Sequence, residues 1–141
     1  NRPFMRTWIK LLLITLIVGI PAFILGPIIW TPSPDIKPTP VQLPFFMFLS
    51  LIESLLFGFG IAAMIYGWEF VRNAPAQAKS KTFAAFISLS WLLISWWPHD
   101  NAHIHNGMDA LGLLYIDYIF HMTLMIASLV LVYYIYSTIK G

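Results

Sequence analysis

The chain has 141 residues, which is enough for one domain, and it contains no cysteine. Hydrophobic residues make up 59% of it and charged residues only 10%, whereas a soluble domain typically carries about 25% charged residues. Because so few charges cannot cover a water-exposed surface, we expect lipid to cover much of this one. The lack of cysteine excludes disulfides, thiolate nucleophiles and cysteine-bound metal sites. The net charge of +2 is too small and too dispersed to indicate nucleic-acid binding.

Four stretches of the chain are apolar enough to be expected to cross a membrane as helices, which takes roughly 20 residues each. Their approximate bounds are residues 8–30, 44–71, 82–97 and 110–139. The second stretch carries Glu53 near its middle, and the fourth carries Asp117 and His121. The sequence therefore predicts an all-α fold, an integral membrane bundle of four transmembrane helices in a single domain over residues 1–141.

Short connections at residues 31–43, 72–81 and 98–109 predict that neighbouring helices are antiparallel. Lys and Arg concentrate on the cytoplasmic side of membrane proteins. In the four-helix arrangement Lys37 lies on one side, and the other seven basic residues lie together on the opposite side: Arg2, Arg6, Lys10, Arg72, Lys79, Lys81 and Lys140. We therefore expect both termini and the 72–81 connection in the cytoplasm, and the other two connections on the extracytoplasmic side.

Small residues form a stripe along the second predicted helix. Ser54, Gly58 and Ala62 follow one another at four-residue spacing, so they share one helix face. Small residues on one face let membrane helices approach closely. The stripe predicts internal packing between two helices of this chain, and contact with another subunit is the alternative.

Three of the four histidines occur within seven residues in the predicted extracytoplasmic loop: His99, His103 and His105. Imidazole is the commonest protein ligand for zinc, copper and iron. His99 and His103 would share a face if this segment were helical, whereas His103 and His105 would do so only if it were extended. We expect Asp109 to cap the last helix and Asp100 to cap a turn or to take part in a proton relay. The alternative to a metal site is a set of solvated polar residues at the membrane interface.

A second polar group lies inside the predicted membrane region. Asp117 and His121 are four residues apart on one helix, and Glu53 lies at a similar depth on another, about 10–17 Å from the outer helix ends. Ionisable groups cost roughly 3 kcal/mol or more in hydrocarbon, so they normally pair or serve a function. Three interpretations remain: a buried metal site formed by these residues, a proton or ion relay, and a structural hydrogen-bond network.

The residue types suit copper, zinc or iron, and a haem held by two of the histidines is not excluded by their spacing. The chain has neither a glycine-rich phosphate loop nor a nucleophile elbow, so no reaction class is predicted. Three functions are compatible with these features. The first is a small metal-binding subunit of a membrane redox or oxygenase complex. The second is a non-catalytic accessory or assembly subunit, bound to other membrane subunits or to itself. The third is an oligomeric proton-coupled transporter or channel that uses Glu53 and Asp117.

Overall fold

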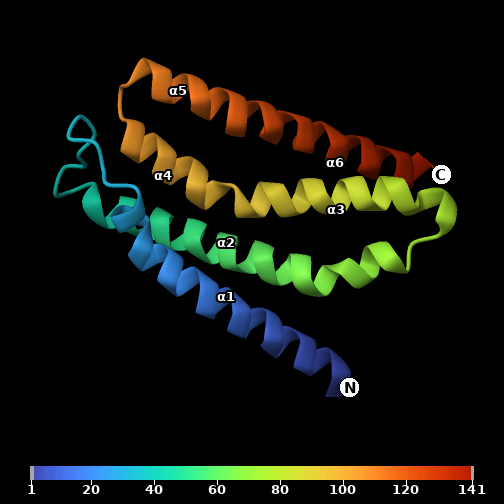
Figure 1. Cartoon of the computed structure of the whole chain (residues 1–141). Helices are drawn as coiled ribbons and strands as arrows, with labels where there is room; N and C mark the ends of the chain where they lie inside the picture. Colours follow the sequence, from blue (N-terminus) through green and yellow to red (C-terminus); the bar gives the residue numbers. More distant parts are fainter. Residues whose placement is uncertain (1, 141) are drawn as a thin grey trace.

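The computed structural model describes residues 2–140, and the side chains from residue 6 onwards. This part of the chain is mostly helical and contains no strand (Figure 1). Its elements, in chain order, are α1 (Arg2–Ile29), α2 (Leu43–Arg72), the 3₁₀ turn η1 (Ala76–Ala78), α3 (Lys79–Ile94), α4 (Trp96–Asn106), α5 (Ala110–Ile116), the π-helical turn η2 (Asp117–His121) and α6 (Met122–Lys140).

The long helices lie side by side in the order in which they occur along the chain (Figure 1). Helix α1 packs against α2, α2 against α3, and α3 against α6. Helix α4 continues α3 and contacts α1, α2 and α5 at the end where the 31–42 loop lies. Helices α1 and α6 therefore form the two edges of an open row, and no helix within residues 2–140 packs on the outer face of either.

Three helical segments are long and apolar enough to cross a membrane, namely Arg6–Ile29, Leu43–Arg72 and Ala110–Lys140. Helix α3 is shorter, at 16 residues, and a bend at Ser95 separates it from α4. Pro98 explains the bend, because it has no N–H to donate to the carbonyl of Ile94. Two successive helices thus stand where a single span over residues 82–97, followed by a loop, was expected.

The expected loop over residues 98–109 is wrong for most of its length, because α4 runs to Asn106. Pro98 falls in the first turn of α4, where a missing N–H breaks no intrahelical hydrogen bond. The helix ends at Gly107, whose φ of +57° is a conformation that glycine adopts without strain. Asp109 then accepts a hydrogen bond from Gly112 N at 2.7 Å, so the predicted cap of the last helical segment is confirmed.

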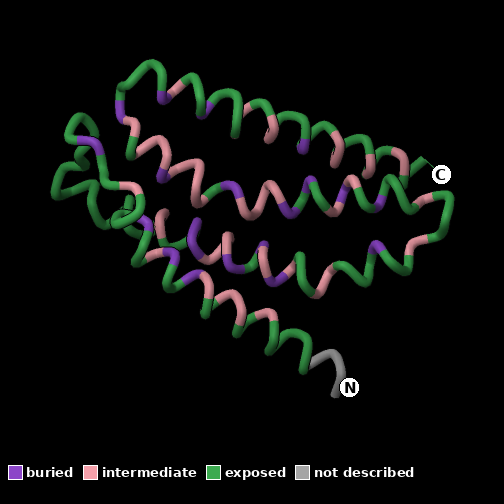
Figure 2. The backbone as a smooth tube through the Cα atoms, viewed as in Figure 1, coloured by how far each residue is buried: buried purple, intermediate pink, exposed green. Residues whose placement is uncertain are grey.

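The distribution of side chains is the reverse of that in a soluble protein. The buried positions are occupied largely by small residues such as Ser54, Ala62 and Ala85, and they face inward along the row (Figure 2). Large apolar side chains lie outside, among them Ile17 at 68% exposed and Leu129 at 68% exposed. Soluble proteins bury such side chains in their core. This surface suits a lipid environment and agrees with membrane localisation.

The small-residue stripe of α2 faces α1. Gly58 lies so close to α1 that a β-carbon there would collide with the backbone of Thr15 and lie 2.9 Å from Gly19 N. Likewise, a β-carbon on Gly19 would lie 2.9 Å from the carbonyl oxygen of Ser54. The stripe is therefore used for packing between two helices of the same chain, as expected.

The close approach at Gly58 makes a first prediction. Gly58→Ala should lower the free energy of unfolding by about 1–3 kcal/mol because the new methyl group meets backbone atoms. This loss should occur although alanine favours a helix by about 1 kcal/mol over glycine. Gly67→Ala on the same helix is the control, since its β-carbon would meet only the ring of Phe86. Denaturation in mixed detergent micelles measures both variants, and equal losses would contradict this packing.

Candidate metal centre

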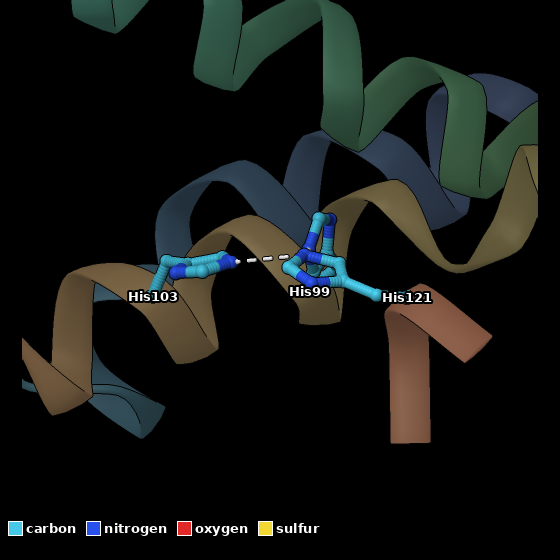
Figure 3. Close-up of side chains that lie close together, drawn as sticks. All are labelled: His99, His103 and His121. Atoms are coloured by element: carbon cyan, nitrogen blue, oxygen red, sulfur yellow. Dashed lines mark hydrogen bonds between the residues drawn. The ribbon is translucent and has the colours of Figure 1, made fainter. Parts of the chain in front are cut away.

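Three histidines from two helical segments converge at one point. His99 and His103 lie one turn apart on α4, and His121 ends the π-helical turn η2 (Figure 3). The Nε2 atom of His121 lies 2.9 Å from Nε2 of His99 and 3.4 Å from Nε2 of His103. One ring nitrogen from each of the three lies within 4.8 Å of the others, so the group can hold a metal ion.

Two of the three nitrogen–nitrogen distances fit imidazole ligands around one ion. Two nitrogens that are each about 2.05 Å from a metal lie about 3.3 Å apart at a tetrahedral angle and about 2.9 Å apart at a right angle. The contacts of His121 with His99 and His103, at 2.9 and 3.4 Å, span the same range. A neutral imidazole has a single lone pair, so Nε2 of His121 cannot accept a good hydrogen bond from both neighbours at once. A metal ion instead uses one lone pair from each ring.

Asp117 fixes the orientation of His121. Its Oδ1 atom lies 2.7 Å from Nδ1 of His121, one helical turn away. The carboxylate accepts the Nδ1 proton, which leaves the lone pair of Nε2 directed at the other two rings. A carboxylate behind a histidine is the usual support for an imidazole that binds a metal, because it holds the ring and raises its basicity.

Helix α3 holds the π-helical turn in place. Trp91 Nε1 donates a hydrogen bond to Thr123 Oγ1 at 2.8 Å, and that hydroxyl donates to the carbonyl of Ile119 at 2.6 Å. The ring of Trp91 also stacks on Phe120, with 6.1 Å between centroids. Carbonyl groups lose regular partners where a helix widens into a π-turn, so the hydroxyl compensates for part of that loss. These contacts set the position from which His121 reaches α4.

The centre is half-buried and open on one side. The side chain of His121 is 42% exposed and that of Asp117 is 59% exposed. The ring of Phe120 contacts that of His99, at 5.2 Å between centroids, and so covers part of the group. Metal sites that also bind water or a substrate typically have three protein ligands and one accessible coordination position.

The other candidate residues lie outside this group of three. His105 contacts the carbonyl oxygen of Thr31 at 2.8 Å and so joins α4 to the 31–42 loop. Glu53 is buried, and Asp100 is the charged neighbour closest to its carboxyl group in effect, so these two acids form a separate pair outside the histidine group. The two polar groups predicted from the sequence therefore contribute to one centre. His99 and His103 come from the predicted extracytoplasmic loop, and His121 comes from the group predicted inside the membrane.

Comparison with known proteins gives no family assignment. No protein-family model matches the sequence, and no match was found among curated proteins or among solved structures. The functional argument below therefore depends on the geometry of the chain itself.

The contact behind His121 makes a second prediction. Asp117→Asn keeps the size of the side chain but removes its charge, so zinc or cobalt affinity of the purified protein should fall by about 10- to 100-fold. Glu69→Gln is the control, since that exposed carboxylate pairs with Arg72, outside the histidine group. Isothermal titration in detergent measures both. Unchanged affinity in Asp117→Asn would mean that the carboxylate does not support a ligand.

Proposed function

We propose that this chain is an integral membrane protein that binds one transition-metal ion through His99, His103 and His121. The observation that carries the proposal is the convergence of three imidazole nitrogens, one of which has a carboxylate at its other nitrogen. We further propose that the chain serves as a small metal-carrying subunit of a membrane redox or oxygenase complex.

The proposed membrane arrangement has four crossings, the third formed by α3 together with α4. Helices α3 and α4 contain 16 and 11 residues, so together they extend about 40 Å. The start of α1, the end of α6 and the α2–α3 connection all lie at the same end of the helices (Figure 1). Seven of the eight basic residues belong to these segments, which favours the cytoplasm for that end. The metal centre then lies towards the extracytoplasmic side.

Nitrogen ligands of this kind suit copper, zinc or iron. The 2.9 Å between the nitrogens of His99 and His121 leaves no room for a porphyrin between them, so a single ion fits better than haem. When bound, such an ion supplies an accessible coordination position for water or a small substrate. The chain's own contribution is to hold three neutral imidazoles in place and to limit access to the open side.

The histidines make a third prediction. Metal analysis of the purified protein after loading with zinc or cobalt should give one ion per chain. Replacing His99, His103 or His121 by alanine should lower the affinity at least about 100-fold, because two ligands hold an ion much less tightly than three.

His105→Ala provides the matched control. It removes a histidine from the same helix, but one that contacts the carbonyl of Thr31 rather than the other rings. This variant should keep one ion per chain. Substoichiometric metal in the unaltered protein, or equal binding by His121→Ala, would refute the proposal. Helical content by circular dichroism verifies that each variant is folded.

The exposure of Asp117 favours an association with other subunits. Its side chain is 59% exposed on a segment at the edge of the row. A carboxylate facing lipid costs roughly 3 kcal/mol or more. A neighbouring subunit or a second copy of the chain, packed on α5 and η2, removes that cost by covering the group. This contact is also the basis of the accessory-subunit alternative, in which the histidines are structural.

Cross-linking provides the fourth prediction. The chain has no cysteine, so an introduced one reacts alone. Tyr118→Cys, at a position 59% exposed beside Asp117, should form cross-linked species in native membranes after labelling with a benzophenone maleimide and illumination, because the excited benzophenone inserts into C–H bonds of any neighbouring chain. Ile17→Cys, at a position 68% exposed on the opposite edge, is the control and should react without forming them. Monomers from both variants would contradict a subunit interface at Asp117.

A further inference from the structure

A cavity of about 720 Å³ lies on the side of α4 that faces α1 and α2. Its walls come from the last part of α1, the first part of α2, the 31–42 loop and one side of α4. The residues of α4 that line it are Asn101 and Ile104, whereas His99 and His103 do not. Ligand sites for small molecules typically have volumes of about 300–1,000 Å³. The cavity is therefore large enough for a ligand and separate from the metal centre.

The cavity is apolar along its depth and charged at its mouth. Phe23, Met47 and Phe46 line it between the two helices, while Asp35 and Lys37 line it at the loop. From Gln42 to Ser50 along α2, the lining extends about 12 Å. The lining changes from charged to apolar along the direction of the helices. A membrane lipid with its head group at the interface changes from charged to apolar in the same direction. A ligand with a charged head and an apolar chain matches both parts.

The two charges at the mouth have opposite signs and do not neutralise each other. Asp35 and Lys37 form no ion pair with the described side chains of residues 6–140, and the carboxylate of Asp35 accepts one hydrogen bond there, from the hydroxyl of Ser33 at 3.4 Å. Lys37 is also the only Lys or Arg in the loop and α4. A head group that carries both an anion and a cation complements this arrangement, with a phosphate at Lys37 and an ammonium at Asp35.

Asn101 adds a polar group to the wall of the cavity. Its side chain lines the cavity and is only 7% exposed. The Nδ2 atom donates to the carbonyl of Trp97 at 2.7 Å, and Oδ1 receives no hydrogen bond from any residue in the described range 2–140. The cavity thus offers a second acceptor, besides Asp35, for a ligand that donates hydrogen bonds.

We propose that this cavity binds one zwitterionic phospholipid with a primary ammonium head, of the phosphatidylethanolamine class. The phosphate lies at Lys37, the ammonium group donates to the acceptors at the mouth, and one acyl chain lies between α1 and α2. A choline head has no N–H and a glycerol head has no positive charge, so both fit less well. The binding goes beyond the metal-binding function and does not depend on it.

Native mass spectrometry of the detergent-purified protein tests the proposal. Titration with phosphatidylethanolamine, phosphatidylcholine and phosphatidylglycerol should give one bound phosphatidylethanolamine, with the other two at least about tenfold weaker. The double variant Asp35→Asn/Lys37→Gln should lose this preference by a similar factor. Its matched control is Glu69→Gln/Lys79→Gln, which also removes one negative and one positive charge, but at the other end of the helices. This control should leave the preference intact.

Trp30 locates the bound lipid, because it lines the cavity. Phosphatidylethanolamine with brominated acyl chains should quench tryptophan fluorescence in the unaltered protein, and clearly less in Trp30→Phe. Equal retention of lipid by both double variants would show nonspecific lipid and overturn the proposal, as would a preference for phosphatidylglycerol or unchanged quenching in Trp30→Phe. Metal content, measured in the same samples, should be the same in all variants, so the outcome is independent of that of the metal centre.

Discussion

The candidate centre depends on one contact, the hydrogen bond between the carboxylate of Asp117 and Nδ1 of His121. In apolar surroundings neither group is stable without a partner. Joining them satisfies both and also fixes which nitrogen of the ring carries the proton. The remaining nitrogen then has no function within its own helix and points to α4, where His99 and His103 meet it. A requirement for local stability thereby provides the orientation that a ligand needs.

Close packing of small residues holds α4 where this contact needs it. A β-carbon on Gly26 of α1 would lie only 3.0 Å from Oδ1 of Asn101, so glycine lets the two helices approach. At the other end of α4, Ser33 N donates to the carbonyl of Ile104 at 2.9 Å, which ties the proline-rich loop to the helix. One short helix is in this way fixed on two sides, and it separates the cavity from the metal centre.

Much of this arrangement could be predicted from local sequence. Apolar runs predicted the three long helices, and the spacing of His99 and His103 predicted a shared face if the segment were helical. The loop over residues 98–109 was predicted wrongly because Pro98 ends one helix and also suits the first turn of the next. The convergence on His121 and the π-helical turn depend on contacts distant in sequence, such as that of Trp91 with Thr123, for which no local pattern exists.

The π-helical turn has a geometric consequence for the whole last segment. In a regular α-helix each residue advances by about 100° around the axis, so one additional residue within a turn rotates everything beyond it by that angle. Helices α5 and α6 are thus out of phase, although they follow one another along a nearly common line (Figure 1). The residues of α5 that face α4 and the residues of α6 that face α3 therefore follow two helical repeats that are shifted by one residue. The one additional residue of the π-helical turn rotates α6 relative to α5. One membrane segment can therefore pack against α4 through its first part and against α3 through its second.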